Sequence, residues 1–469
     1  MLSVAYLANQ FPSAVEPYVG EEIEELRRRG VRVIAGSVSP VAEQEGRGRN
    51  LPDVVICPLR ASLLLRGFLL FLRRWAQISR LLLRIFLGGR EGPVRRMKAL
   101  FHTGLGVCYA VQLRERYRRV GQIHAHHGYA ASWIAMTASR LLGCPFSMTL
   151  HGSDLLLHGD YLDLKLRYCS ECFTISDFNR RYLLRHYPAV DPKKVIVARL
   201  GVEVKEREDW PCAGKIGPRL CLLAVGRLHA VKDHAFLVRA CAQLQAHAIG
   251  FECSIAGDGP ERKRLESLIS RYGLEERVTL LGHVPRQQMD SLYARADIVV
   301  LTSRSEGIPL VLMEAMSRGK VVLAPAITGI PELVVPGQTG FLYQPGSLGD
   351  FVARLLSIHS LLRSSAVAQA RSEGSSDLCS DLALAVWQLA WVRFGARVQV
   401  LHNFNRRNSL KLFADALLHR LRSGTETIPH ENPLLQQIQL PLQRYRGLPV
   451  RTDGSDALTR ARSGAVLHV

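Results

Sequence analysis

Two cations stand close to the end of a predicted strand, where they could bind a negatively charged ligand. Arg227 follows the apolar run 222–225, and Lys232 comes five residues later. A guanidinium can bind a diphosphate through paired hydrogen bonds, and an ammonium adds a compact charge. The pair therefore suits a diphosphate, although a solvated basic loop is an equally simple interpretation of these two residues alone.

Two carboxylates, Glu306 and Glu314, follow another predicted strand and lie eight positions apart. Glu306 falls in the loop after the apolar run 298–301, whereas Glu314 falls about two turns into the helix that follows. A carboxylate can accept two hydrogen bonds from a vicinal diol. Glu314 is therefore a candidate ligand of a ribose, and Glu306 is a candidate ligand of a transferred sugar.

The segment between the two carboxylates has the properties of an anion site. Gly307 permits a close backbone approach, and Pro309 suits the first turn of a helix. The free N–H groups at such a helix start, together with the helix dipole, attract an anion. Two loops after other predicted strands are expected to border the same crevice, and they contribute Gly257, Gly259 and Val284.

These residues need parallel sheets to bring them together, and the sequence predicts two such sheets. Apolar runs alternate with helical segments, an α/β pattern typical of Rossmann-like domains. Ligands of such sheets bind outside the carboxyl ends of the strands. Charged residues with prolines and glycines interrupt the pattern around 202–217 and predict a linker. The runs interpreted as strands are 2–7, 31–35, 54–57, 122–126, 220–225, 252–256, 278–281, 298–301 and 321–324.

The arrangement resembles the retaining GT-B glycosyltransferases of family four, which include bacterial exopolysaccharide enzymes. The signature is the segment from Glu306 to Glu314, preceded by Gly-Arg-Leu at 226–228 and by Lys232. The resemblance implies two Rossmann-like domains whose parallel sheets face an interdomain cleft, and residues 363–395 depart from the family pattern. The predicted organisation is an acceptor-binding domain at 1–205, a linker at 206–218, a sugar-nucleotide-binding domain at 219–395, a returning helix at 396–422 and a flexible tail at 423–469.

The resemblance also implies roles for the site residues. Arg227 and Lys232 would hold the donor diphosphate, Glu314 its ribose, and Glu306 its sugar. His151 would lie across the cleft near the reacting carbon, and its other interpretation is a strand cap that binds backbone. The backbone that would contact the sugar belongs to Gly307, Ile308, Pro309 and Leu310. The family motifs on the acceptor side contain Phe11, Pro12, His127 and Asp154.

The reaction implied is transfer of a hexose with retention of configuration, in which the departing phosphate helps to deprotonate the acceptor hydroxyl. The catalytic set would be His151, Arg227, Lys232 and Glu306, with Glu306 orienting or stabilising the sugar. Cations and helix N–H groups would stabilise the leaving diphosphate. Two alternatives remain at this point, a sugar-nucleotide epimerase of the same fold and a degenerate protein that only binds a sugar nucleotide.

The expected donor is a UDP- or GDP-linked sugar, and no further cofactor is expected to be required. No Asp-x-Asp triplet is present, which argues mildly against a metal. The one close cysteine pair, Cys169 and Cys172, lies in a stretch interpreted as helix. Without a second pair or histidines at ligand spacing, we expect unpaired packing thiols and no metal site.

The net charge of +20 indicates an anionic partner. The segment from Arg60 to Arg119 carries fourteen lysines and arginines against two acids, interleaved with leucines and phenylalanines. No run there reaches the roughly 18 apolar residues of a membrane-spanning helix. We expect a basic amphipathic surface helix that binds anionic lipid and brings the cleft to a lipid-linked saccharide acceptor. The alternative is an ordinary packed helix with its arginines in water.

Nucleic acid is not an expected partner, because no nucleic-acid-binding motif accompanies the positive charge. No secretory signal is visible at the start of the sequence. We therefore expect a cytoplasmic protein, with peripheral attachment to the inner face of the cytoplasmic membrane as a further expectation.

Overall fold

The computed structural model describes residues 2–13, 16–40, 51–88, 91–117, 119–157, 159–204, 217–372 and 380–423. The predicted linker, except residues 217 and 218, and the predicted tail, except residue 423, lie outside these residues.

The N-terminal half contains a sheet of seven strands in the order β3-β2-β1-β4-β5-β6-β7. Every neighbouring pair is parallel. The strands are β1 (Ser3–Gln10), β2 (Arg32–Ser39), β3 (Val54–Val55), β4 (Gln122–His126), β5 (Phe146–Leu150), β6 (Glu171–Thr174) and β7 (Val195–Val197). The direction of the strand order changes between β1 and β4, so a crevice for ligands is expected beside their carboxyl ends.

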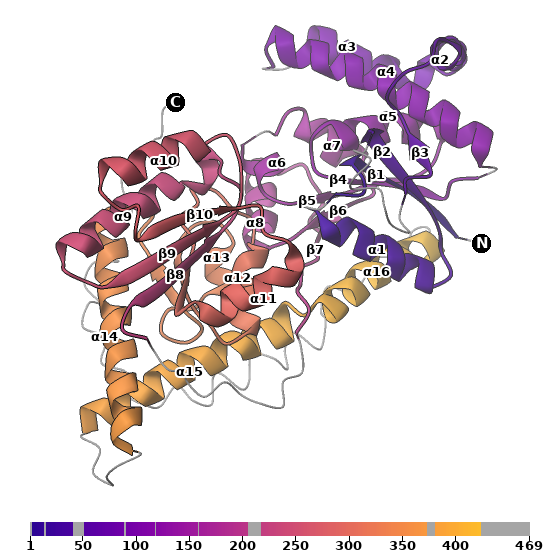
Figure 1. The fold of residues 1–469 in the computed structure, drawn as a ribbon. Helices are drawn as coiled ribbons and strands as arrows, with labels where there is room; N and C mark the ends of the chain where they lie inside the picture. The colour runs from indigo at the N-terminus through magenta and orange to yellow at the C-terminus, as the bar shows by residue number, and fades with distance from the viewer. Residues whose placement is uncertain are drawn as a thin grey trace. The chain divides into compact units, whose positions relative to one another are not determined.

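Helices connect these strands and cover the sheet (Figure 1). They are α1 (Pro17–Arg28), α2 (Ala61–Arg73), α3 (Trp75–Leu87), α4 (Pro93–Arg116), α5 (Ala130–Leu142), α6 (Ser153–Leu156), α7 (Leu162–Tyr168), α8 (Asp177–His186) and the short η1 (Pro192–Lys194). Pro17 stands in the first turn of α1, a position that needs no backbone donor. Ser176 caps α8, because its hydroxyl accepts a hydrogen bond from the Asn179 amide.

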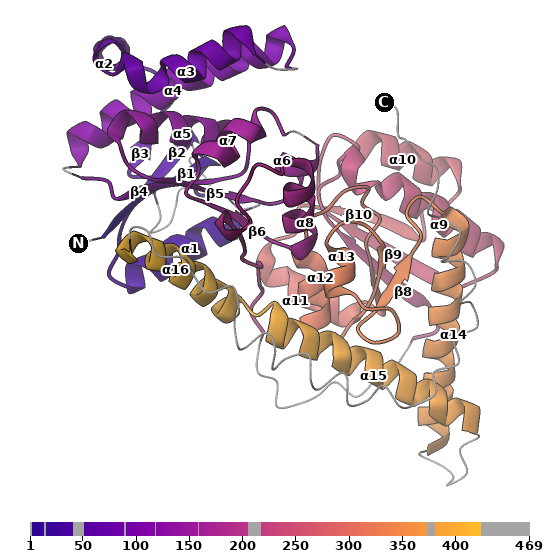
Figure 2. The same cartoon turned by 180° about the vertical axis from the view of Figure 1, so that it is seen from behind.

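The basic amphipathic helix expected within residues 60–119 corresponds to α2, and the rest of the segment forms the two further helices α3 and α4. Glycines at 88, 89 and 92 and a proline at 93 interrupt the helical pattern before α4. α2 and α3 lie over α4, on its side away from the sheet (Figures 1 and 2). Within the described part of the chain, no helix is both long enough and apolar enough to cross a bilayer.

The second sheet has six parallel strands in the order β10-β9-β8-β11-β12-β13. They are β8 (Leu220–Val225), β9 (Phe251–Ala256), β10 (Val278–Gly282), β11 (Ile298–Val300), β12 (Val321–Pro325) and β13 (Phe341–Tyr343). The order again changes direction between two central strands, β8 and β11. The connecting helices are η2 (Ala230–Lys232), α9 (His234–Ala246), α10 (Arg262–Arg271), α11 (Arg286–Arg295), α12 (Leu310–Ser317) and α13 (Ile330–Leu333).

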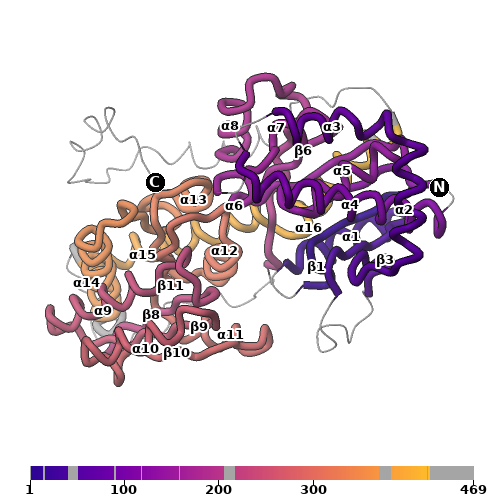
Figure 3. Tube along the Cα trace, turned by 90° about the horizontal axis from the view of Figure 1, so that it is seen from above, coloured from indigo at the N-terminus to yellow at the C-terminus, as the bar shows by residue number. Residues whose placement is uncertain are grey.

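Three C-terminal helices complete the described chain, namely α14 (Leu348–Ser372), α15 (Ser380–Asn403) and α16 (Arg406–Ser423). α15 contributes Ala396 and Val400 to the core of the second half. α16 contributes Phe413 and Leu417 to a core shared with α1 and β1. The chain therefore returns to the first sheet through α16 (Figure 3), and the predicted boundary at 395 falls inside α15.

The helical interpretation of the cysteine pair is wrong. Cys169 ends α7, and Cys172 lies within strand β6. Both thiols are buried in the first core, and burial raises the pKa of Cys169 to about 12. The described cysteines are all free, which agrees with packing thiols.

Candidate active site

The loop after β8 is held by the glycine loop after β9. Gly257 has a φ of +150°, and a Cβ there would overlap the carbonyl oxygen of Gly226. Gly259 has a φ of +156°, and its Cβ would lie 2.5 Å from the Leu228 carbonyl oxygen. Only glycine permits this backbone-to-backbone packing. The packing fixes the segment that carries Arg227, whose side chain is exposed.

Lys232 and Glu306 form the ion pair at the centre of the predicted donor site. The Lys232 Nζ lies 2.5 Å from the Glu306 Oε1, and both side chains are largely buried. The Thr302 hydroxyl donates a hydrogen bond to the Lys232 carbonyl at 3.0 Å, and the Thr328 hydroxyl donates to the Glu306 carbonyl at 2.6 Å. Two threonine hydroxyls therefore hold the backbone of the cation and of the carboxylate, and the structure pairs two residues that the sequence had placed at the donor site separately.

Arg227 differs from Lys232 in having no acidic partner among the residues that the structure describes. An exposed guanidinium at a strand end keeps its full hydrogen-bonding capacity for a ligand. Of the two cations predicted to bind the diphosphate, Lys232 is therefore paired with a carboxylate and Arg227 is not, within the described residues.

Glu314 lies on α12 and points its Oε2 at a tyrosine hydroxyl. The Tyr293 hydroxyl donates a hydrogen bond to this oxygen at 2.8 Å. Burial, followed by the charge of Glu314, raises the pKa of Tyr293 well above its usual range. The phenol therefore stays protonated and holds the carboxylate in place, while Glu314 remains half-buried.

The segment before α12 presents its backbone to the site. The side chains of Ile308 and Pro309 are buried, and Ile308 belongs to the core of this half. The helix begins at Leu310, so the first-turn N–H groups have no partners inside the helix. The predicted anion site is therefore made of backbone, and Val284 lies half-buried in the loop after β10.

The loop of Gly307 touches the loop that follows β5. A Cβ on Gly307 would overlap the carbonyl oxygen of His151, and a Cβ on Gly152 would lie 3.2 Å from the Gly307 Cα. Only glycines permit this approach. The contact brings His151 beside the predicted sugar-binding loop.

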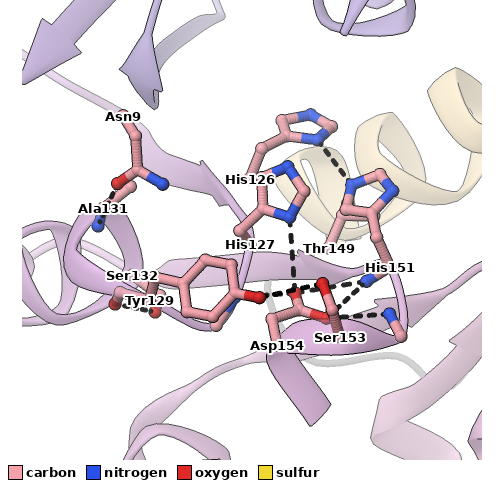
Figure 4. A network of polar contacts seen from close by, with 12 residues as sticks. Asn9, His126, His127, Tyr129, Ala131, Ser132, Thr149, His151, Ser153 and Asp154 are labelled. Atoms are coloured by element: carbon pink, nitrogen blue, oxygen red, sulfur yellow. Dashed lines mark hydrogen bonds and ion pairs between the residues drawn. The ribbon is translucent and has the colours of Figure 1, made fainter. Parts of the chain in front are cut away.

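The His151 ring is held by two neighbours, His126 at the end of β4 (Figure 4) and Tyr18 on helix α1. Its Nε2 lies 3.1 Å from the Nδ1 of His126. The Tyr18 ring stacks on it, with the ring centroids 4.7 Å apart. Burial, followed by the nearby His127 charge, lowers the pKa of His151 well below its usual range. The His151 ring is therefore neutral near neutral pH.

Asp154 holds the two loops around His151, and its carboxylate is fully buried. It accepts hydrogen bonds from the amides of Gly128 at 2.8 Å, His151 at 3.0 Å and Gly152 at 2.8 Å. Burial alone would raise its pKa, but His127 and these amides outweigh burial and lower it. Asp154 is therefore an ionised acceptor that shapes two loops (Figure 4).

His127 lies between two carboxylates. Its Nε2 is 2.8 Å from Glu16 Oε1, and its Nδ1 is 3.7 Å from Asp154 Oδ2, an ion-pair distance rather than a hydrogen bond. Burial alone would lower the pKa of His127, but Asp154 and Glu16 outweigh burial and raise it to about 10. His127 is therefore a buried cation at neutral pH.

The other two acceptor-side candidates lie at the end of β1. Phe11 is buried in a core cluster, and its amide donates a hydrogen bond to the Ser37 hydroxyl at 3.0 Å. Pro12 beside it is half-buried. The structure thus places Phe11 as a packing residue at the end of β1.

Several residues of the site were not predicted as site residues. Glu16 and Tyr18 follow the loop after β1, and His126 ends β4. Their positions near the carboxyl ends of these strands could have indicated that they belong to the site. The carboxylate of Glu332 accepts hydrogen bonds from the amides of Asp177 at 3.0 Å and Phe178 at 2.6 Å. The unpredicted site residues are Glu16, Tyr18, Glu22, His126, Tyr293 and Glu332.

Glu22, His124 and His126 bring ligand-type atoms within 4.8 Å of one another. The two ring nitrogens of His124 already bind Ser147 at 2.8 Å and Thr149 at 3.1 Å. His126 binds Glu22 and His151. We interpret this cluster as a hydrogen-bond network, since its polar atoms already have partners.

Comparison with protein families gives two adjacent matches. Residues 207–372 match the family described as glycosyl transferases group 1. Residues 86–206 match the glycosyltransferase family 4. The two matches meet where the predicted linker begins.

Three curated relatives are similar to parts of the chain. A putative colanic acid biosynthesis glycosyltransferase of Salmonella typhimurium is 35% identical over 35% of this chain and 42% of its own. The amylovoran biosynthesis glycosyltransferase AmsK of Erwinia amylovora is 29% identical over 48% and 51%. The alpha-D-kanosaminyltransferase of Streptomyces kanamyceticus is 28% identical over 53% and 72%. The matches thus span less than half the length of the colanic acid relative.

Solved structures share the fold at low sequence identity. The sucrose-phosphate synthase of Thermosynechococcus elongatus has a TM-score of 0.66 at 18% identity, covering 91% of this chain and 100% of its own. HepE of Anabaena, solved with UDP and glucose, has a TM-score of 0.60 at 18% identity, covering 89% and 100%. The expected GT-B fold class is confirmed.

Proposed function

We propose that this chain, a glycosyltransferase by its matches to the group 1 family over residues 207–372 and to family 4 over residues 86–206, transfers a hexose from a nucleoside-diphosphate sugar to an acceptor with retention. The observation that carries the proposal is the Lys232–Glu306 pair, in which Lys232 ends η2 and Glu306 lies on the loop whose Gly307 contacts His151. The donor would be linked to UDP or GDP, and no cofactor beyond the donor is proposed.

Donor binding would use the two cations differently. Arg227 is exposed and would bind the diphosphate directly, whereas Lys232 would share its charge between Glu306 and a phosphate oxygen. Glu314, held by Tyr293, would accept hydrogen bonds from the ribose hydroxyls. The first-turn N–H groups of α12 would face the sugar and phosphate.

The chemical step would depend on charge stabilisation rather than on a base of the protein. Negative charge grows on the leaving diphosphate, and Arg227, Lys232 and the α12 dipole would stabilise it. The departing phosphate would take the proton of the acceptor hydroxyl. Glu306 would orient the sugar through its remaining oxygen, and His151 would contact it as a neutral ring.

The acceptor we propose is a lipid-linked saccharide of exopolysaccharide or cell-surface glycan synthesis. Two relatives are described as colanic acid and amylovoran biosynthesis glycosyltransferases. Such an acceptor requires the site to reach a membrane surface, and we propose that the protein binds the inner face of the cytoplasmic membrane peripherally.

The helices α2 and α3 support this membrane proposal. α2 buries Leu63 and Leu70 and exposes Leu65 and Phe68, which are 63% and 58% exposed. α3 likewise exposes Phe86 and Leu87 at 59% and 81%. Arginines at 66, 73, 80 and 84 lie on the same helices, and Arg74 lies between them. Exposed large apolar side chains among cations suit an anionic bilayer interface.

Replacing the exposed apolar side chains of α2 should weaken vesicle binding. We expect the triple variant Leu65→Ser, Phe68→Ser, Leu72→Ser to weaken sedimentation with anionic phosphatidylglycerol vesicles by about tenfold or more, because each side chain contributes roughly 1.5 to 3 kcal/mol on burial. The matched control is Leu384→Ser with Trp387→Ser, which removes exposed apolar area on α15. Equally weak binding of the unaltered protein to neutral and anionic vesicles would rule out the lipid surface.

Slow donor turnover tests the proposed activity without a known acceptor. We expect the protein to release a nucleoside diphosphate from one member of a panel of UDP- and GDP-sugars. Glu314→Ala should reduce this release by about tenfold or more, since the ribose loses a charged partner. Glu266→Ala on exposed α10 is the control. NMR of the released sugar should show the anomer of the donor, and the opposite anomer would contradict retention.

A further inference from the structure

A chain of three side chains links helix α1 to the loop after β5. Glu22 lies on the buried face of α1, and its Oε2 is 3.0 Å from the Nε2 of His126. The Nδ1 of His126 is in turn 3.1 Å from the Nε2 of His151. Each distance fits a hydrogen bond, so the carboxylate is connected to His151 through one intervening imidazole.

The carboxylate end of this chain sets the direction of the hydrogen bonds. An ionised carboxylate only accepts hydrogen bonds, so the proton between Glu22 and His126 belongs to the His126 Nε2. The Tyr6 hydroxyl donates to the same carboxylate oxygen at 2.8 Å. Burial, followed by the Glu22 charge, raises the pKa of Tyr6 well above its usual range. Both neighbours of this oxygen are therefore donors.

The direction continues through His126 to His151. A neutral imidazole carries one N–H, so His126 with its proton on Nε2 offers a bare Nδ1 as acceptor. The protonated His127 ring lies 4.4 Å from the His151 ring, and its charge disfavours a second imidazolium at His151. The shared proton then belongs to the His151 Nε2.

The remaining nitrogen of His151 is left without a proton. Among the residues that the structure describes, no hydrogen bond engages this Nδ1. Stacking of Tyr18 on the ring holds its plane, and the His151 carbonyl touches the Gly307 loop. His151 is thus held in one orientation and one tautomer at the edge of the proposed sugar site.

We propose that Glu22 and His126 are positioning residues that fix His151 as its Nε2–H tautomer, so that its bare Nδ1 accepts a hydrogen bond from a hydroxyl of the transferred sugar. This inference rests on the proposed function for the identity of the ligand. The tautomer itself is a property of the free protein, so it can be measured whether or not the protein transfers sugar.

Nitrogen NMR of the protein labelled with ¹⁵N-histidine tests the tautomer directly. We expect the His151 signals, assigned by their loss in His151→Asn, to show an N–H on Nε2 and an unprotonated Nδ1 at neutral pH. An N–H on Nδ1 would overturn the proposal, because it would mean that His126 donates to His151. Absence of donor turnover in the same sample would count against the proposed function and leave this result unaffected.

Kinetics of Glu22 variants test the effect on the proposed reaction. Glu22→Ala frees His126 to adopt either tautomer, so we expect kcat to fall by about tenfold or more with the donor KM changed less than about twofold. Glu22→Gln should restore most of kcat, because its carbonyl oxygen can still accept from Tyr6 and His126. Glu25→Ala, one turn on and paired with Arg29, is the control.

Two kinetic outcomes would contradict the proposal. One is a Glu22→Gln variant as slow as Glu22→Ala. The Gln carbonyl oxygen still accepts hydrogen bonds, so equal slowing would show that accepting from His126 is not the role of Glu22. The other is a Glu22→Ala variant with unchanged kcat. If Glu22→Ala does not fold, the comparison of Glu22→Gln with the unaltered protein, together with the NMR measurement, still decides the question.

Discussion

Lys232→Ala is expected to lower kcat for sugar transfer by about 10²- to 10³-fold, the usual effect of removing one charge-stabilising donor from a transition state. Lys232 Nζ lies 2.5 Å from Glu306, and Lys232 is the less exposed of the two cations proposed to hold the diphosphate. Negative charge grows on that diphosphate as the glycosidic bond breaks. The loss should therefore be larger in kcat than in donor KM.

Steady-state kinetics with the donor found in the turnover screen checks this expectation. Lys263→Ala is a suitable control, because Lys263 is exposed on α10 of the same half. A variant of Lys232 that retains kcat within about threefold of the control would show that Lys232 does not stabilise the leaving group. Thermal unfolding of both variants separates this effect from loss of fold.

Asp154→Ala is expected to destabilise the protein by about 3 to 5 kcal/mol, the range seen when one partner of a buried ion pair is removed. Asp154 is fully buried and accepts hydrogen bonds from three backbone amides. Its removal leaves these amides without an acceptor and leaves the His127 cation with Glu16 alone. Asp415→Ala is the control, because Asp415 pairs with Arg29 at the surface, where such pairs contribute about 1 kcal/mol or less.

The same cluster predicts a pH dependence of stability. The lowered pKa of Asp154 gives stability that is present above about pH 4, the unfolded value, and is lost as the pH falls through the folded value. The raised pKa of His127 gives stability that is full below about pH 6.5 and is lost as the pH rises through about 10. Denaturant unfolding at several pH values should show a smaller alkaline loss in Asp154→Ala, and an unchanged loss would contradict this account of His127.

Nine of the thirteen strands in the described residues were predicted, because each is a short apolar run bounded by turn residues, whereas β5, β6 and β7 were not. Strand β8 matches its predicted range 220–225, and β4 matches 122–126. Strand β13 was missed because Phe341–Tyr343 is too short to show a periodic pattern. The α2–α3 break was missed because the arginines and leucines around Arg74 are good helix formers on both sides.

The strand-end positions of the donor-site candidates were easier to predict than the contacts around His151, for a physical reason. Arg227, Lys232, Glu306 and Glu314 all follow strands of one sheet, so spacing along the sequence indicates their common edge. The Glu22–His126–His151 chain joins a helix face to two strand ends. Such contacts depend on how α1 packs against the sheet, and no sequence spacing reports that packing.

Calorimetric titration of UDP and GDP is the most direct test of the donor site. We predict that one of the two nucleotides binds at one site per chain, and that Arg227→Ala and Glu314→Ala each weaken it by about tenfold or more, while Glu266→Ala does not. Binding that survives both substitutions, or no binding of either nucleotide, would contradict a nucleoside-diphosphate site built on these residues.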